Sequence, residues 1–276
     1  MTRVTLNRWQ LFQVFKYTIY ALLTLNIFLF YFEESVAAQL QFDGGIALGR
    51  VIEAYAATID TLAWVILLLM FELETFVLQA HHFTRRVVWT LQTVRLGAYA
   101  FIVYSFFGYI ANLTFLDGVV PLANVSDLCT LGDGWSYATG LDTFVPITPE
   151  NCMAFSSATS FYQLPGMLTV VDADGQFGNR MLAWVDVINS GVWLLVVLLL
   201  EIDVRLQEHD RYRGTALQAS NASKVVMYLV LLLAAIYWGL KGDFVDFWDA
   251  FLWLVAFFFI ELNVVEWHRE SDAAPT

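Results

Sequence analysis

Residues 64–74 read WVILLLMFELE, a run of eight strongly apolar residues that ends at two glutamates, Glu72 and Glu74. A run of this kind is typical of a helix that spans a lipid bilayer. A carboxylate in hydrocarbon is costly, and such groups usually face a protein interior or a polar partner. The surroundings of Glu72 therefore bear on both the fold class and the candidate site of this protein.

The whole chain has the composition of an integral membrane protein. Its 276 residues are 59% hydrophobic and only 14% charged, and the mean hydropathy is +0.61. Soluble domains average about 45–50% apolar and about 25% charged residues. A spanning helix needs about 20 apolar residues to cross about 30 Å of hydrocarbon. Six segments meet this requirement, at about 10–32, 55–78, 88–111, 182–203, 224–240 and 245–265.

The distribution of lysine and arginine predicts the orientation of these spans. If both termini lie inside, the outer segments carry only Arg50, Arg180 and Lys241. The positive-inside rule then places the N- and C-termini in the cytoplasm, and we expect a bacterial inner membrane. The net charge of −12 comes largely from outer acids, which either keep the surface soluble or form a vestibule for cations. The sequence contains no basic patch with interleaved aromatic residues, which is the pattern that would indicate nucleic-acid binding.

A long outer loop, 113–181, separates the third and fourth predicted spans. It contains four of the five prolines and many small polar residues, so it is predicted to form a turn-rich extracytoplasmic cap with a few short strands. Both cysteines, Cys129 and Cys152, lie in this loop. Because the compartment outside the cell is oxidising, we predict a disulfide between them; two unrelated buried thiols are the alternative.

The even-numbered spans share the pattern [DN]-x3-W-x7-E-[LI]-[EDN], without gaps. An internal repeat must be recognised before any site is argued, because it determines the architecture. The three copies are Asp60, Trp64, Glu72, Leu73 and Glu74; Asn189, Trp193, Glu201, Ile202 and Asp203; and Asp249, Trp253, Glu261, Leu262 and Asn263.

The odd-numbered spans share a second pattern, [QN]-x2-[KR]-x3-Y. At about 100° per residue, its three positions fall on one stripe of a helix. The copies are Gln13, Lys16 and Tyr20; Gln92, Arg95 and Tyr99; and Asn221, Lys224 and Tyr228.

The two patterns together predict an all-α integral membrane fold of six transmembrane helices. These form three helical hairpins, 8–80, 85–205 and 220–268, related by a pseudo-threefold axis within one membrane domain, 1–276, with the small cap between the third and fourth helices. Each repeat places a base and a glutamate near the cytoplasmic end of its helices. We therefore expect Glu72, Glu201 and Glu261 to face Lys16, Arg95 and Lys224.

The remaining positions of the patterns have supporting roles. The tyrosines Tyr20, Tyr99 and Tyr228 lie one turn deeper and can donate to a carboxylate. Each tryptophan lies about 12 Å along the axis from its glutamate, so it is a packing residue or an anchor at the outer leaflet.

Two hypotheses follow for these charges. In the first, the ion pairs hold the hairpins together and fix their register. The protein is then a non-catalytic structural or accessory subunit that docks other membrane proteins or further copies of itself. In the second, the three glutamates form a ring, widened by Glu74, Asp203 and Asn263. Intramembrane carboxylates facing a wet interior mark ion or proton paths, so this hypothesis predicts a channel or carrier for a small cation or protons. The transport hypothesis is the primary prediction.

The motifs of common enzymes and cofactor sites are missing from the sequence. It contains no glycine-rich phosphate loop, nucleophile elbow, His-Glu-x-x-His or Cys-x-x-Cys. We therefore expect no enzyme, no cofactor and no metal. The four histidines His81, His82, His209 and His268 follow the repeated glutamates; they can complement helix dipoles or, with the acids, bind a transition metal.

Overall fold

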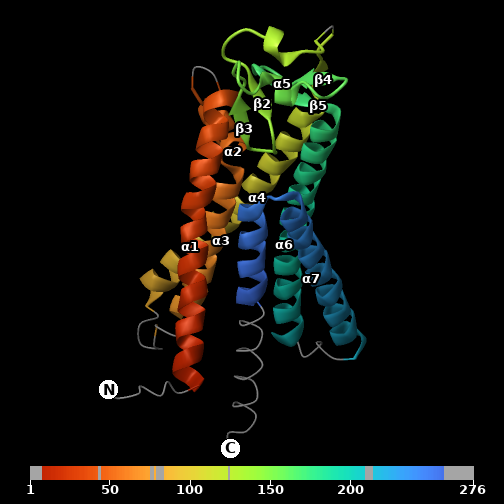
Figure 1. Cartoon of the computed structure of the whole chain (residues 1–276). Coiled ribbons are helices and arrows are strands. Elements are labelled where there is room, and N and C mark those ends of the chain that lie inside the picture. The colour runs from red at the N-terminus through yellow and green to blue at the C-terminus, as the bar shows by residue number, and fades with distance from the viewer. Residues whose placement is uncertain are drawn as a thin grey trace, which may run out of the picture. The chain divides into compact units, whose positions relative to one another are not determined.

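The computed structural model describes residues 8–42, 45–74, 78, 84–123, 125–208 and 214–257. The chain divides into two compact units. The first comprises the described residues up to Ile27 and from Leu199 onward, and the second comprises Phe28–Leu198. The long helices are α1 (Arg8–Gln41), α3 (Ala56–Glu72), α4 (Arg85–Leu116), α6 (Ala173–Glu208) and α7 (Thr215–Lys241), and residues 244–257 are also helical (Figure 1).

Several helices are long and apolar enough to cross a membrane. They are Gln10–Gln41, Arg85–Leu116, Ala173–Asp203 and Thr215–Lys241. A fifth span is possible if Leu48–Ala54 and Ala56–Glu72, which are bent by 83° relative to each other, count as one broken span. The prediction of a multi-pass membrane protein is therefore supported by the length and composition of its helices.

The prediction of six continuous spans is wrong for the part of the chain that the structure describes. The predicted second span, 55–78, is preceded by a sharp break at Tyr55, where η1 (Leu48–Arg50) and α2 (Val51–Ala54) meet α3. The predicted sixth span is described only over 244–257. The rest of this predicted span, 258–265, lies outside the described residues.

The break at Tyr55 is stabilised by a side chain from another helix. Tyr55 offers no side-chain cap to α3. Instead, the carboxylate of Glu34 on α1 accepts hydrogen bonds from the backbone N–H groups of Ala57 and Thr58, at 2.7 and 3.0 Å, and from the Thr58 hydroxyl at 2.6 Å. The first N–H groups of a helix have no partner within the helix, so an external carboxylate is a suitable acceptor.

The loop between α4 and α6 folds into a small sheet, in keeping with the few short strands expected in the cap, so the chain is mostly helical rather than all-α. Figure 1 shows the sheet at the end of α4 and the start of α6. The strand order is β1-β4-β5-β2-β3; β2 and β5 pair in parallel and the other neighbours are antiparallel. The strands are β1 (Val120–Pro121), β2 (Ser136–Ala138), β3 (Phe144–Pro146), β4 (Phe161–Gln163) and β5 (Thr169–Asp172).

Alternating residues of this sheet enter two different apolar clusters. Val170 and Phe161 belong to one cluster, which Leu128 of η4 (Leu128–Thr130) completes. Val171, the next residue of β5, belongs to the other cluster, together with Leu113 of α4. Successive side chains of a strand point to opposite faces. The short strands therefore have apolar cover on both faces, and one face rests on the helices.

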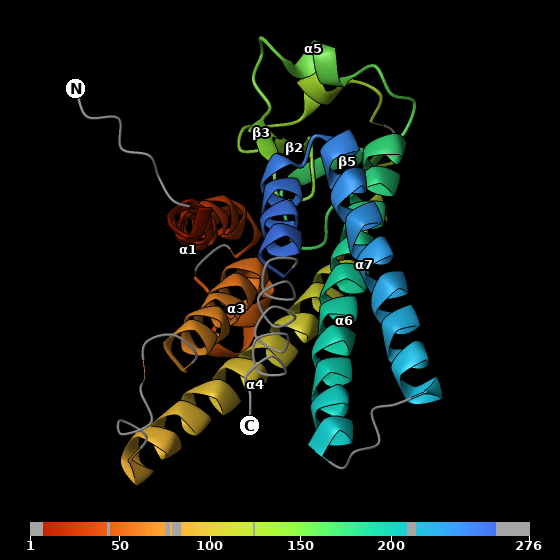
Figure 2. The same cartoon turned by 90° about the horizontal axis from the view of Figure 1, so that it is seen from below.

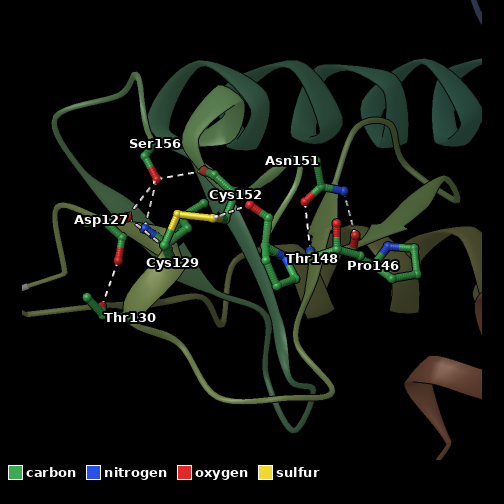
Figure 3. Close-up of a disulfide and its surroundings, with 10 residues drawn as sticks. Asp127, Cys129, Thr130, Pro146, Thr148, Asn151, Cys152 and Ser156 are labelled. Atoms are coloured by element: carbon green, nitrogen blue, oxygen red, sulfur yellow. Dashed lines mark hydrogen bonds between the residues drawn. A yellow bond between two sulfur atoms is a disulfide. The ribbon is translucent and has the colours of Figure 1, made fainter.

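The predicted disulfide between Cys129 and Cys152 is confirmed (Figure 3). It joins η4 to α5 (Cys152–Phe155), with a Cα–Cα distance of 5.0 Å. Figure 3 also shows Asp127 accepting a hydrogen bond from the backbone N–H of Cys129 at 2.8 Å. The hydroxyl of Ser156 donates to the carbonyl of Cys152, also at 2.8 Å. The turns on both sides of the disulfide are thus held by their own side chains.

Close packing within the second unit depends on a glycine. Helices α3 and α4 run side by side (Figure 2). A Cβ atom built on Gly108 of α4 would lie 2.7 Å from the carbonyl oxygen of Ile52 and 3.0 Å from the Cβ of Ala56. Small residues at helix interfaces let the backbones approach in this way.

Candidate functional site

The charged residues of the two sequence patterns are found in different environments. Lys16 and Glu72 are buried, although both stand on apolar helices. Glu201 is exposed and forms an ion pair at 3.0 Å with Arg205, one turn along the same helix. Glu261 and Asn263 lie outside the described residues. The described part of the chain therefore places one of the three predicted glutamates in a buried position.

The second acid of the even-span pattern is the partner in two ion pairs. Arg95 of α4 forms an ion pair with Glu74 at 2.5 Å. Lys224 of α7 forms an ion pair with Asp203 of α6 at 2.8 Å. The sequence predicts instead that the bases face Glu72, Glu201 and Glu261, and it assigns Glu74 and Asp203 only a supporting role.

The pair between Lys224 and Asp203 is the more buried of the two. The Asp203 side chain is 4% exposed, and that of Lys224 is 20% exposed. The hydroxyl of Ser220 donates a further hydrogen bond to Asp203 at 2.6 Å. Two groups of α7, the Lys224 ammonium and the Ser220 hydroxyl, thus contact the same carboxylate oxygen of α6, which joins the two helices at this point.

The three tyrosines of the odd-span pattern are not equivalent. Tyr20 is buried, Tyr228 is partly buried and Tyr99 is exposed. The ring of Tyr20 contacts Tyr17 edge to face, at a centroid distance of 6.1 Å. Hydrogen bonding of these tyrosines to the carboxylates stays a prediction.

A second polar position lies about three turns before the glutamate on each even helix. Asp60, Asn189 and Asp249 open the even-span pattern, twelve residues before the glutamate. The hydroxyl of Tyr109 on α4 donates to Asp60 at 3.4 Å. The amide nitrogen of Asn26 on α1 donates to Asp249 at 2.8 Å. The spans of this protein therefore contain polar contacts at two depths.

The tryptophans of the pattern are packing residues rather than anchors at a lipid interface. Trp64, Trp193 and Trp253 are all buried. The rings of Trp64 and Trp193 contact each other at a centroid distance of 5.9 Å, which brings one face of α3 toward one face of α6. Asp60 and Asn189 each lie one turn before these tryptophans on helices with the same chain direction. They therefore lie at a similar level of the interface between α3 and α6.

Several polar contacts of the pattern residues join neighbouring predicted repeats, whereas Glu34 joins α1 to α3 within the first repeat. An even helix of one repeat contacts the odd helix of the next: α3 with α4, α6 with α7, and the helix at 244–257 with α1. The first two helix pairs are adjacent in the chain, whereas Asn26 and Asp249 are 223 residues apart. The third contact is therefore the informative one, because chain connectivity does not impose it.

Sequence reasoning missed Asn26, although a signal for it was present. Asn26 lies ten residues after Lys16, and the residues ten positions after Arg95 and Lys224 are Ser105 and Ala234. All three are buried, and Asn26 and Ser105 are completely inaccessible. The residues seven positions after the bases, Leu23, Ile102 and Leu231, are also fully buried. Burial thus recurs at the same offsets from the three bases, as on one face of a helix, and the repeat itself stays a prediction.

The four histidines fall outside the described residues, so the hypothesis of a histidine-containing metal site stays untested. Comparison with protein families, with curated proteins and with solved structures finds no match to this chain. Its function must therefore be argued from its own residues.

Proposed function

We propose that this protein is a multi-pass membrane transport protein, a channel or carrier for protons or another small cation. The observation that carries the proposal is the presence of buried carboxyl groups, Glu72 and Asp203, on predominantly apolar helices. Ionisable groups within spans are costly and most often line the path of an ion or proton. The chain contains no motif that favours an enzyme instead.

The proposed path uses polar groups at two depths. Near one end of the spans are the three repeated glutamates, Glu72, Glu201 and Glu261, with Lys16, Arg95 and Lys224 modulating them. The residues of the second level are Asp60, Asn189 and Asp249, three turns away along each even helix. We propose further that the three hairpins are related by a pseudo-threefold axis, in a bacterial inner membrane with both termini inside.

The ion pairs favour a second candidate, a non-catalytic structural or accessory subunit. Arg95 with Glu74, and Lys224 with Asp203, each join two helices. Glu34 similarly binds the start of α3. Polar groups that serve only to fix helix packing need no connected path, and the exposed apolar faces of the helices would then contact lipid or partner subunits.

The Glu72→Gln variant separates the two candidates. This substitution removes the charge and keeps the size of the side chain. We expect proton or cation flux into proteoliposomes to fall at least tenfold while the melting temperature changes little. Glu53→Gln serves as the matched control, because Glu53 forms a partly exposed pair with Arg50 at 2.8 Å outside α3, and its flux should equal that of the wild type. Unchanged flux together with a lower melting temperature would support the accessory subunit and eliminate the path.

A further inference from the structure

A carboxyl group and a carboxamide meet in the first unit of the protein. The Nδ2 atom of Asn26 on α1 donates to Oδ1 of Asp249, in the helix at 244–257, at 2.8 Å. Asn26 has no accessible surface. This contact joins segments far apart in the chain, at the opening position of the even-span pattern.

One half of the Asn26 carboxamide has no hydrogen-bond partner among the described residues. Its Oδ1 atom is buried and accepts no hydrogen bond there. An unsatisfied buried acceptor costs about 1–3 kcal/mol, so it calls for an explanation. An ionised carboxylate is acceptor-only and cannot satisfy Oδ1, whereas a protonated carboxyl group has one O–H to donate.

The groups around Asp249 offer no compensating positive charge within the described residues. Its recorded hydrogen bonds come from Asn26 of α1 and from the side chain of Trp253, one turn along its own helix. Helix α7 also packs here, because Gly239 approaches the ring of Phe247. The buried residues of the adjacent half of α7 are all uncharged: Leu231, Ala234, Ala235 and Trp238. An ionised carboxylate without a cationic partner is very costly in such surroundings.

We propose that Asp249 is a proton-binding site in which the neutral carboxyl group and the Asn26 carboxamide join through two hydrogen bonds. The amide N–H donates to one carboxyl oxygen, as observed, and the carboxyl O–H donates to Oδ1 of Asn26. A hydronium ion of the solvent gives its proton to the other carboxyl oxygen and becomes water, and no other bond changes. This inference rests on the proposed transport function and names its substrate as the proton.

The repeat itself supplies a matched substitution. The residue of the second repeat that corresponds to Asp249 is Asn189. Asp249→Asn places an amide opposite Asn26, and two amides can still form two hydrogen bonds. The variant therefore keeps the packing of the helix but has no proton to release.

Infrared difference spectroscopy of the full-length protein between acidic and alkaline pH tests the proton site. The wild type should show the C=O stretch of a protonated carboxyl group, with the shift in D2O that marks an exchangeable proton. Asp249→Asn should lose this band, and the control Asp243→Asn, just before the same helix, should retain it. Asn26→Leu should move the band, because it removes the acceptor of the O–H group.

Each outcome of this experiment supports or overturns the site. A band that persists in Asp249→Asn would overturn the site. If Asp249→Asn does not fold, the Asn26→Leu variant decides, and a band identical to that of the wild type would overturn the site. A band that responds to added sodium at constant pH would assign a metal cation instead of a proton. The transport function is measured separately. If the band is lost but proton flux into proteoliposomes is unchanged, the site is real and the proposed function fails.

Discussion

The cap and the spans of this protein differ in where they place polar and large apolar residues. In the cap, completely buried side chains such as Phe161 and Val170 are apolar, as in any soluble domain. In the spans, Asn26 and Ser105 are completely buried, while large apolar residues such as Leu25 and Phe28 lie on the surface. Water drives apolar groups into the interior of the cap, but lipid does not, so span interfaces depend on close packing and internal hydrogen bonds.

The largest expected effect tests the apolar side of this comparison. Phe161 is 1% exposed in the outer cluster of the cap. Phe161→Ala should destabilise the cap by about 3–5 kcal/mol, because it removes a buried ring and leaves a cavity. The loss can be measured as a lower midpoint of guanidinium unfolding. Unfolding of the cap is monitored through its cleavage by a protease. Leu168→Ala, at a residue that is 53% exposed, should change the midpoint little. Equal effects of the two variants would contradict an apolar core in the cap.

A smaller effect is expected at the close contact between α4 and its neighbours. Gly108→Ala places a methyl group against the backbone of Ile52 and should cost about 1–3 kcal/mol. Gly97→Ala, on the same helix, is the matched control because nothing lies within 4 Å of its Cβ position. It should be neutral or stabilising by up to about 1 kcal/mol, since alanine favours the helix. Melting temperatures in detergent distinguish these cases. If Gly97→Ala lowers the melting temperature more than Gly108→Ala does, close packing at Gly108 does not limit this helix interface.

The smallest effect concerns the pH dependence of the cap. Burial, a hydrogen bond to Asp172 and the charge of Asp172 raise the pKa of Tyr137 from 10.0 to about 12. Because the folded pKa lies above the unfolded one, the contribution of Tyr137 is fully present below pH 10. It is lost as the pH rises toward about 12. Tyr137→Phe should remove this part of the fall in the stability of the cap with rising pH. Unfolding of the cap measured at several pH values in this range provides the check, and identical pH profiles for both proteins would refute the assignment.

The spans were predictable from the sequence to different degrees. Runs of apolar residues identified the membrane class, because hydrocarbon thickness sets a minimum length. Their bounds were less predictable. Helix α6 begins at Ala173 rather than near 182, because a helix can continue beyond the lipid, where composition no longer constrains it. The bend at Tyr55 depends on Glu34, an acceptor that lies more than twenty residues away, so no local pattern reveals it.

The cap illustrates a different limit. Composition predicted its turns, and the compartment predicted the disulfide between Cys129 and Cys152. A few short strands were expected in the cap, but their positions were not predicted, because strands of two to four residues are too short for an alternating pattern to stand out. Pairing along the sheet, rather than local preference, makes these segments extended.

The candidate site divides in the same way. The repeated patterns identified which residues carry charge in the spans, because an acid in an apolar run is conspicuous in the sequence alone. Which acid meets which base was decided only by the tertiary structure: Arg95 binds Glu74, and Lys224 binds Asp203. The same holds for Asn26 and Asp249, whose contact joins residues 223 positions apart. The sequence determines the cost of placing a polar group in a span, but only the packing of helices determines the partner that offsets it.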